Sequence, residues 1–236
     1  MSQATNQITD PVTTGFPLLI TGFLSGCSGF SDITHSPHEQ KEEKMNQKAY
    51  RLRTGYELTK PADYPAGSVF TISDLHLDHE NIISYCNRPF HNTAEMNRVL
   101  INNWNYVVKP TDTVFYVGDM SFGKADKFIR KLHGNIIFIS GNHDEIDDID
   151  RIQEYAYLSY KDITFLFVHD PWMKPAEFQG WTIHGHHHNN NPAKYPFFDP
   201  DKKKINVSVE MIRYHPYPMD CIVNMIKENH ERIVTG

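Results

Sequence analysis

Five short apolar runs in this sequence each end in residue types that bind metal ions. The first run, residues 69–73, leads into Asp74 and His76. On an extended backbone these two side chains would point the same way. A carboxylate beside a neutral imidazole forms half of the ligand shell of a divalent metal. Because such a pair also arises by chance, a surface acid near a histidine would be the simpler interpretation if the pair stood alone.

The other four apolar runs end in the same residue types and make chance a poor explanation. They lie at residues 114–117, 136–139, 165–168 and 181–183. Aspartate and asparagine after glycine are also common turn residues, and a histidine run can be a surface tract. The five coincidences together favour a shared metal site. The candidate residues that follow these runs are Asp119, Asn142, His143, Asp144, His169, His186 and His188.

Strands must position these residues, and the order of strands and helices along the chain predicts the fold class. Strands alternate with helices early in the sequence and follow one another later, which favours an α/β layered sandwich. Candidate ligands after strand ends would then meet at one rim of the sheets. The expected strands cover residues 69–73, 113–117, 135–140, 156–160, 163–168, 181–184 and 204–209, and the expected helices cover 80–86, 92–109, 124–132, 147–155 and 220–229.

The helix over residues 92–109 has the clearest pattern. Asn92 is a suitable N-cap, and Glu95 follows it at the spacing of a capping box. Apolar residues then recur at helical spacing along one face, which predicts that this face is buried.

Composition limits the function classes. The chain has 236 residues, 39% of them apolar, which suffices for one sizeable core. A formal charge of −6 argues against a dedicated nucleic-acid coat protein, although it leaves a local basic groove open. Three scattered cysteines form no C-x-x-C pair, so we expect no disulfide framework and a cytoplasmic location. No apolar run approaches the roughly 20 residues that span a bilayer.

The N-terminal part differs from the rest. We interpret residues 1–60 as a poorly ordered leader or linker and residues 61–236 as the functional domain. The segment ending at Cys27 resembles a bacterial lipoprotein cleavage box, which would give a lipid anchor. No lysine or arginine precedes Lys41, so the positive segment of such a signal is missing.

The five motifs together resemble those of the calcineurin-like metallophosphoesterases. Their order and approximate spacing match over roughly residues 67–229. The segments 79–83 and 87–90 resemble a small branch of bacterial and phage phosphoesterases within that superfamily. The matching motifs are Asp74-x-His76, Gly118-Asp119, Gly141-Asn142-His143-Asp144, His169 and Gly185-His186-x-His188.

The resemblance implies a four-layer αββα sandwich, in which two mixed β-sheets are flanked by helices, with two divalent metal ions at the sheet edge. It implies one ion held by Asp74, His76 and His188. It implies a second held by Asn142, His169 and His186, and a bridge from Asp119. A nitrogen and oxygen ligand set without thiolate favours Mn²⁺, with Fe, Zn²⁺ or Ni²⁺ as alternatives.

The same resemblance implies phosphoester hydrolysis by a hydroxide between the two ions. His143 would face the substrate, and Asp144 would hold the imidazole of His143 in one tautomer. His184 and His187 alternate to the other face and are not expected to be ligands. Arg88 and His79 are candidate phosphate contacts, although a surface salt bridge is an equal interpretation of Arg88.

The sequence leaves the substrate class open between three alternatives. Gly118-Asp119 is not followed by the arginine of the protein phosphatases, which argues against a phosphoprotein substrate. We expect a small phosphodiester, such as a nucleotide derivative or a nucleic-acid end. A phosphomonoesterase and a non-catalytic metal-binding scaffold of the same fold remain the alternatives.

Overall fold

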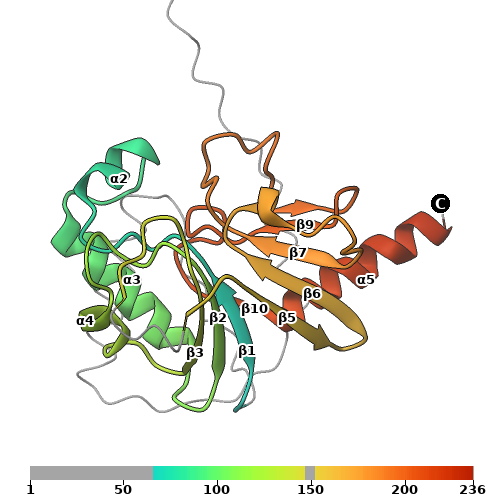
Figure 1. Cartoon of the computed structure of the whole chain (residues 1–236), viewed down its shortest axis with the longest axis horizontal. Helices are drawn as coiled ribbons and strands as arrows, with labels where there is room; N and C mark the ends of the chain where they lie inside the picture. The colour runs from blue at the N-terminus through green and yellow to red at the C-terminus, as the bar shows by residue number, and fades with distance from the viewer. Residues whose placement is uncertain (1–65, 147–151, 236) are drawn as a thin grey trace, which may run out of the picture.

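The computed structural model describes residues 66–146 and 152–235, which form two β-sheets and the helices around them (Figure 1). The leader proposed for residues 1–60, including Cys27, lies outside this part of the chain, as does the domain boundary at residue 61. The elements are β1 (Val69–Ile72), α2 (Glu80–Tyr85), α3 (Thr93–Val107), β2 (Thr113–Val117), α4 (Asp126–Ile129), β3 (Asn135–Ile139), β4 (Ile152–Gln153), β5 (Tyr155–Tyr160), β6 (Ile163–Val168), η2 (Pro171–Met173), β7 (Trp181–His184), β8 (Phe198–Asp199), β9 (Lys204–Asn206), β10 (Tyr217–Pro218) and α5 (Met219–Thr235).

The first sheet has the strand order β10-β1-β2-β3-β4. Strands β1 to β4 are parallel, and β10 joins the edge of β1 in the antiparallel direction. Parallel strands place their carboxyl ends at one edge of the sheet. The loops after β1, β2 and β3 therefore emerge together, and these are the loops that carry the first three motifs.

The second sheet has the strand order β5-β6-β7-β9-β8. Its three central strands are parallel, while β5 and β8 pair with them in the antiparallel direction. The β5–β6 hairpin turns through Lys161 and Asp162, which have φ angles of 49° and 67°. Two positive φ angles at the centre of a two-residue hairpin match the twist of the flanking strands. The hairpin predicted at these residues is confirmed.

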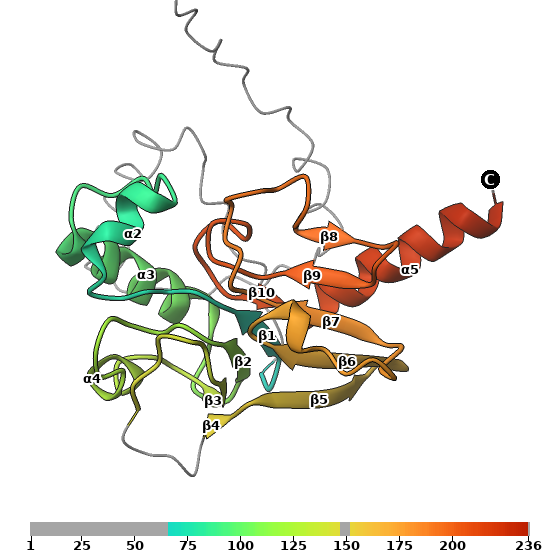
Figure 2. The ribbon, with the colours of Figure 1, turned by 45° about the horizontal axis from the view of Figure 1, so that its top comes forward.

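The two sheets pack face to face, and helices cover their outer sides. Alternation along β2 sends Phe115 toward the second sheet, where its ring stacks on Phe167 of β6 at a centroid distance of 4.1 Å. Tyr116 points the opposite way, and its ring lies 6.1 Å from that of Trp104 in α3. Figure 2 shows α3 and α4 gathered beside the first sheet and α5 extending from the other end of the molecule. The predicted fold class, two mixed sheets flanked by helices, is confirmed.

A short bridge joins the two sheets close to the end of β1. Ser73 pairs with Ser208 in a parallel bridge, and the backbone N–H of Val207 donates to the carbonyl of His184. The expected strand over residues 204–209 is therefore two parts, because β9 ends at Asn206 and residues 207–209 cross to the first sheet. This crossing ties the ends of β1 and β7 together, so their loops meet.

Three other element predictions need correction. Residues 152–153 form β4 and residue 155 begins β5, so an acidic helix over 147–155 is wrong, because β4 pairs with the edge of β3. Residues 147–151 lie outside the described part. The helix expected over 124–132 is regular only over Asp126–Ile129. The loop expected to reach Pro200 contains β8, which pairs with β9.

Within the described residues, no helix is both long enough and apolar enough to cross a membrane.

Candidate metal centre

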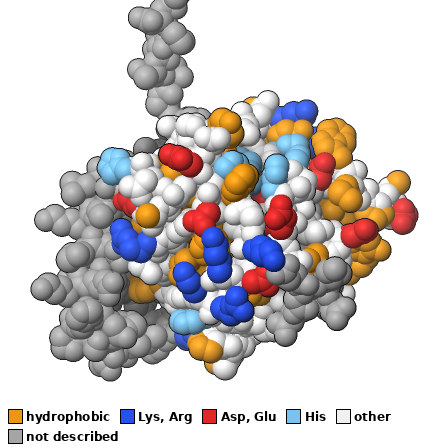
Figure 3. Space-filling model, turned by 60° about the vertical axis from the view of Figure 1, so that its left-hand side comes forward, with side chains coloured by type: hydrophobic (Ala, Val, Ile, Leu, Met, Phe, Trp, Pro, Cys, Tyr) orange, Lys and Arg blue, Asp and Glu red, His pale blue; other side chains and the backbone are white. Residues whose placement is uncertain are grey.

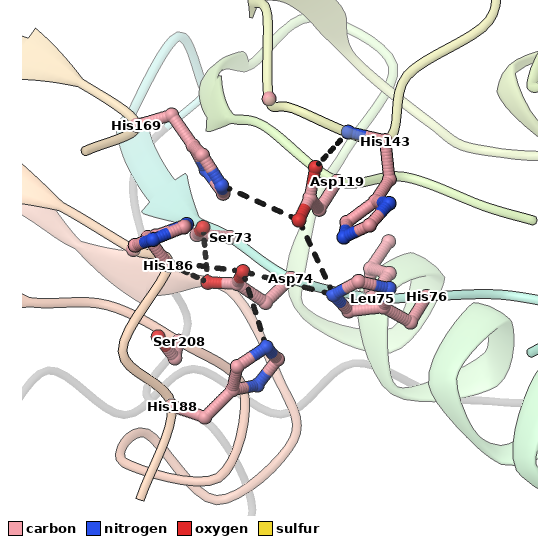
Figure 4. Close-up of polar contacts among 12 residues, drawn as sticks. Ser73, Asp74, Leu75, His76, Asp119, His143, His169, His186, His188 and Ser208 are labelled. Atoms are coloured by element: carbon pink, nitrogen blue, oxygen red, sulfur yellow. Dashed lines mark hydrogen bonds and ion pairs between the residues drawn. The ribbon is translucent and has the colours of Figure 1, made fainter. Parts of the chain in front are cut away.

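Sharp backbone turns after the strands aim the candidate ligands into one pocket (Figure 4). The φ angles of Asp74, His76 and Asp119 are 61°, 49° and 61°. Those of His186 and His188 are 69° and 47°. Left-handed backbone is uncommon for residues with a side chain and is found mainly where the surrounding structure enforces it, often at functional sites. The turns send alternate side chains inward at the rim shared by both sheets.

The first predicted ligand set converges on Asp74. The Oδ1 atom of Asp74 lies 3.5 Å from Nε2 of His188 and 3.9 Å from Nε2 of His76. All three side chains are buried. One ligand atom from each of the three lies within 4.8 Å of the others, which is close enough to contact a common ion.

The second predicted set gathers around Asn142. Its Oδ1 atom lies 3.0 Å from Nδ1 of His186 and 3.2 Å from Nε2 of His169. Ligands that surround one ion at about 2.0–2.2 Å end up with separations of this size. Asp119 lies between the two sets, since its Oδ2 atom is 3.3 Å from Nε2 of His169 and 3.4 Å from Nε2 of His76.

Two glycines permit this close packing. A Cβ atom on Gly141 would overlap the carboxylate of Asp119, and one on Gly185 would overlap Ser73 Oγ and the carboxylate of Asp74. Only glycine therefore fits at position 141, before Asn142, and at position 185, before His186. The carboxylate of Asp74 also accepts a hydrogen bond of 2.5 Å from the hydroxyl of Ser73.

Hydrogen bonds fix which nitrogen of two imidazoles faces the pocket. Nδ1 of His169 lies 2.8 Å from the carbonyl oxygen of Val117, which only accepts, so the proton is on Nδ1. Nδ1 of His188 lies 3.1 Å from both carboxylate oxygens of Glu210 and donates in the same way. In both residues Nε2 is therefore the nitrogen that faces the pocket, and it can ligate a metal ion once it has lost its proton.

Neighbouring carboxylates raise the pKa of two imidazoles in the pocket. Burial opposes a charged imidazole at His188, but the carboxylates of Asp74 and Glu210 raise the pKa of His188 to about 11. Burial acts the same way at His169, where hydrogen bonding to Asp119 and the charge of Asp74 raise the pKa to about 9. Positive charge is therefore stabilised in this pocket.

One buried nitrogen of the first ligand set has no hydrogen-bond partner among the described residues. Nε2 of His76 is inaccessible to solvent and makes no hydrogen bond. Burial lowers the pKa of His76 to about 4, so its ring is neutral and can offer a nitrogen lone pair to a cation. An unpartnered buried nitrogen is costly unless something occupies the space between it and the nearby carboxylates. A divalent cation fits this donor set.

Glu210 supports the centre and was not predicted from the sequence. It forms an ion pair with Arg88, at 2.7 Å between Oε1 and Nη2, beneath His188. Nη1 and Nη2 of Arg88 also donate to the carbonyl oxygens of Leu75 and Asp74, each at 2.8 Å. Every guanidinium nitrogen of Arg88 is thus bonded inside the protein, which leaves no donor pointing to a substrate. A single glutamate in a loop forms no sequence motif, so Glu210 could not be predicted. In the structure, the burial of Arg88 implies that it needs an acidic partner.

The remaining predicted site residues lie around the pocket. His143 is exposed, with its ring 5.9 Å from that of His76, and its backbone N–H donates to Asp119 Oδ1. The carboxylate of Asp144 accepts from the backbone N–H groups of Asp119, Met120 and Gly141, so it holds the loops rather than the His143 ring. His79 is half-buried beside His76, with 3.4 Å between their Nδ1 atoms.

His184 and His187 take no part in either ligand set. Nδ1 of His184 lies 3.0 Å from the carbonyl oxygen of Gly185, and His187 stacks on Tyr195. Neither residue belongs to a group of described side chains that could hold a metal ion.

Three solved structures are similar to this chain to different degrees. A protein of unknown function from Aquifex aeolicus matches with a TM-score of 0.53 and 26% identity, over 68% of this chain and 100% of that one. Vacuolar Protein Sorting 29 from Cryptosporidium parvum matches at 0.35 and 16%, over 60% of this chain and 73% of that one. An archaeal phosphodiesterase matches at 0.34 and 19%, over 60% and 82%. The last two scores are too low to support an inference about function.

No family model matches the sequence. An uncharacterized protein of Methanocaldococcus jannaschii is 46% identical over 166 residues, which are 68% of this chain and 92% of that protein. At this identity and coverage, the chain belongs to the same family as the uncharacterized Methanocaldococcus jannaschii protein.

Proposed function

We propose that this protein is a metal-dependent phosphoesterase of the calcineurin-like superfamily. In this proposal the protein would hold two divalent ions, Mn²⁺ first among the candidates, and hydrolyse phosphodiesters of the nucleotide type. One observation carries the proposal. Side chains that follow strands in both sheets converge into two adjacent groups, and these contain the residues expected from the five motifs.

The proposed roles follow from the positions of the side chains. Asp119 lies between the two groups and would contact both ions. Bound together, the ions would supply a hydroxide near neutral pH and neutralise charge on the phosphoryl oxygens. The exposed ring of His143 stands beside His76 and would donate a proton to the leaving oxygen.

Two predicted site residues take supporting roles in this proposal. Arg88 positions the backbone of Asp74 and Leu75, and Asp144 positions the backbone of Asp119 and Gly141. His79 remains the candidate substrate contact, because it lies at the rim beside His76.

The segments around α2 support placing the chain in the small bacterial and phage branch of the superfamily. Cys86 and Cys221 are buried and are not joined in a disulfide, which supports a cytoplasmic, reducing location.

The test compares two chromogenic substrates. With Mn²⁺ supplied, we expect hydrolysis of bis-p-nitrophenyl phosphate to exceed that of p-nitrophenyl phosphate. Asp119→Asn keeps the shape of the side chain and should lower the rate at least a hundredfold, because the shared ligand is lost. Turnover of the monoester alone would reject the diesterase assignment. Bound metal in both proteins without hydrolysis in either would identify a non-catalytic scaffold.

A further inference from the structure

Exposed aromatic side chains flank the candidate metal centre on two sides. On the His76 side, Phe122 is 68% exposed and stacks on His79 at 5.5 Å between ring centroids. Tyr85, also 68% exposed, makes an edge-to-face contact with His79 at 6.4 Å between ring centroids. We call Phe122, His79 and Tyr85 the first platform.

The second platform lies on the His186 side and combines rings with cations. Trp172 is 70% exposed, and the Nζ atoms of Lys194 and Lys204 lie 5.9 Å and 5.7 Å from its ring centroid. Lys194 also lies 5.1 Å from the ring of Tyr195. We call Trp172, Tyr195, Lys194 and Lys204 the second platform.

Ring contacts connect each platform to a different ligand set. The Tyr195 ring stacks on His187 at 3.5 Å, and the His187 ring lies 5.1 Å from that of His186. On the other side, the His79 ring lies 5.3 Å from that of His76. Figure 4 shows His186 and His76 on opposite sides of Asp74 and Asp119. The first platform therefore contacts the first ligand set, and the second platform contacts the second set through His187.

The backbone holds both platforms in place. Phe122 donates its N–H to the carbonyl of Leu77 at 2.8 Å, next to the turn that carries His76. The side chain of Asp170 accepts from the N–H of Trp172 at 2.9 Å, one residue after His169. Large rings on anchored backbone need not be immobilised when a ligand binds, which lowers the entropy cost of binding.

The chemistry of the platforms selects the groups on either side of the phosphate. Nucleobases stack on exposed aromatic rings, and nearby lysines attract the phosphates of the same strand. Figure 3 shows that the face with the histidines also carries basic side chains, with acidic ones among them. We propose that the scissile phosphate joins two unpaired nucleosides, whose bases stack on Phe122 on one side and on Trp172 on the other. This inference rests on the proposed function only in placing the phosphate at the metal centre.

The test measures base binding without catalysis. The probe is a thymidine dinucleotide with an uncharged methylphosphonate linkage, offered to the protein in EDTA so that neither repulsion by the carboxylates nor cleavage interferes. Of the three tryptophans, Trp104 and Trp181 are 0% and 9% exposed, so fluorescence quenching reports on Trp172. We expect saturable quenching by the dinucleotide and none by the abasic dinucleotide with the same linkage.

Variants separate the two platforms. Phe122→Ala should weaken binding of the dinucleotide about tenfold and leave binding of thymidine alone unchanged, because only one base is affected. The control is Tyr157→Ala, which removes an exposed aromatic of β5 and should change neither. Saturation-transfer NMR needs no tryptophan fluorescence. It should detect weaker transfer to the bases in Trp172→Ala than in the wild type, and undiminished transfer in Trp172→Phe, which keeps an aromatic ring.

The outcomes distinguish this inference from the proposed function. Equal quenching by the abasic probe, or equal binding by Phe122→Ala and Tyr157→Ala, would overturn the two-sided stacking. Hydrolysis of bis-p-nitrophenyl phosphate without quenching would leave a phosphoesterase that does not bind bases. Quenching without hydrolysis would leave base binding and reject the enzyme.

Discussion

Arg88 and Glu210 form an ion pair whose side chains have almost no solvent exposure, 0% and 2%. Burying two charges is costly unless other hydrogen bonds compensate. Here the guanidinium also holds the carbonyl oxygens of Asp74 and Leu75, and the carboxylate also orients His188. The pair therefore connects the backbone of one candidate ligand with the side chain of another.

Glu210→Gln should weaken binding of Mn²⁺ roughly 10- to 100-fold, because carboxylates that orient a ligating histidine contribute about this much. It should also lower the free energy of unfolding by about 3–5 kcal/mol, since Arg88 stays buried without its partner. Calorimetric titration and urea denaturation measure the two effects. The control is Glu228→Gln on the exposed face of α5, which should change neither. Unchanged metal affinity would show that Glu210 only neutralises Arg88.

At the scale of elements, the best-predicted helix depends on the residue that caps its start. The Oδ1 atom of Asn92 accepts the N–H of Glu95 at 2.9 Å, as the sequence pattern predicts. The carboxylate of Glu95 accepts from the N–H of His91 rather than from Asn92, so the capping box is displaced by one residue. The cap fixes where α3 begins and how its buried face meets β2.

Replacing Asn92 by alanine should cost about 1 kcal/mol of unfolding free energy, because an N–H at the helix start loses its acceptor. Asn92→Asp, which keeps an acceptor oxygen, should retain the stability of the wild type. Urea denaturation monitored by circular dichroism compares the two variants. Equal losses in both would mean that the amide group, not its oxygen, stabilises the start of α3.

The sequence predicts an element well when the element's own residues determine it, and poorly when pairing with another segment does. Strands such as β2 and β6 are continuous apolar runs, and their bounds are predicted to within a residue. Strands β8 and β10 have two residues each, which is too short for a pattern, and β10 exists because the distant strand β1 offers an edge. The same reasoning applies to the site. Motifs after strong strands predict Asp74 and Asp119, whereas Glu210 depends on a contact with Arg88, 122 residues away.

At the scale of the molecule, the two sheets contribute different ligands to one centre. Asp74 and Asp119 follow strands of the first sheet, while His169, His186 and His188 follow strands of the second. A metal ion bound there would join the sheets at their rim, in addition to the stacking of Phe115 on Phe167.

Mn²⁺ should therefore raise the melting temperature of the whole described domain, and EDTA should reverse the rise. At a free concentration 100 times the dissociation constant, the expected gain is roughly 2.7 kcal/mol. Differential scanning fluorimetry measures the shift. It should vanish in Asp119→Asn and persist in Asp201→Asn, an exposed aspartate in the turn before β9. A shift of equal size in all three proteins would place the binding elsewhere.

The bond from the backbone N–H of His186 to the carboxylate of Asp74 spans 112 residues of sequence. During synthesis, Asp74, His76 and Asp119 leave the ribosome long before the histidines that complete their surroundings. The nascent chain must carry the carboxylates of Asp74 and Asp119 without these imidazole partners until His169, His186 and His188 have emerged. The centre is thus completed only after strands of both sheets have been synthesised, so a half-made chain has little means of capturing a metal ion.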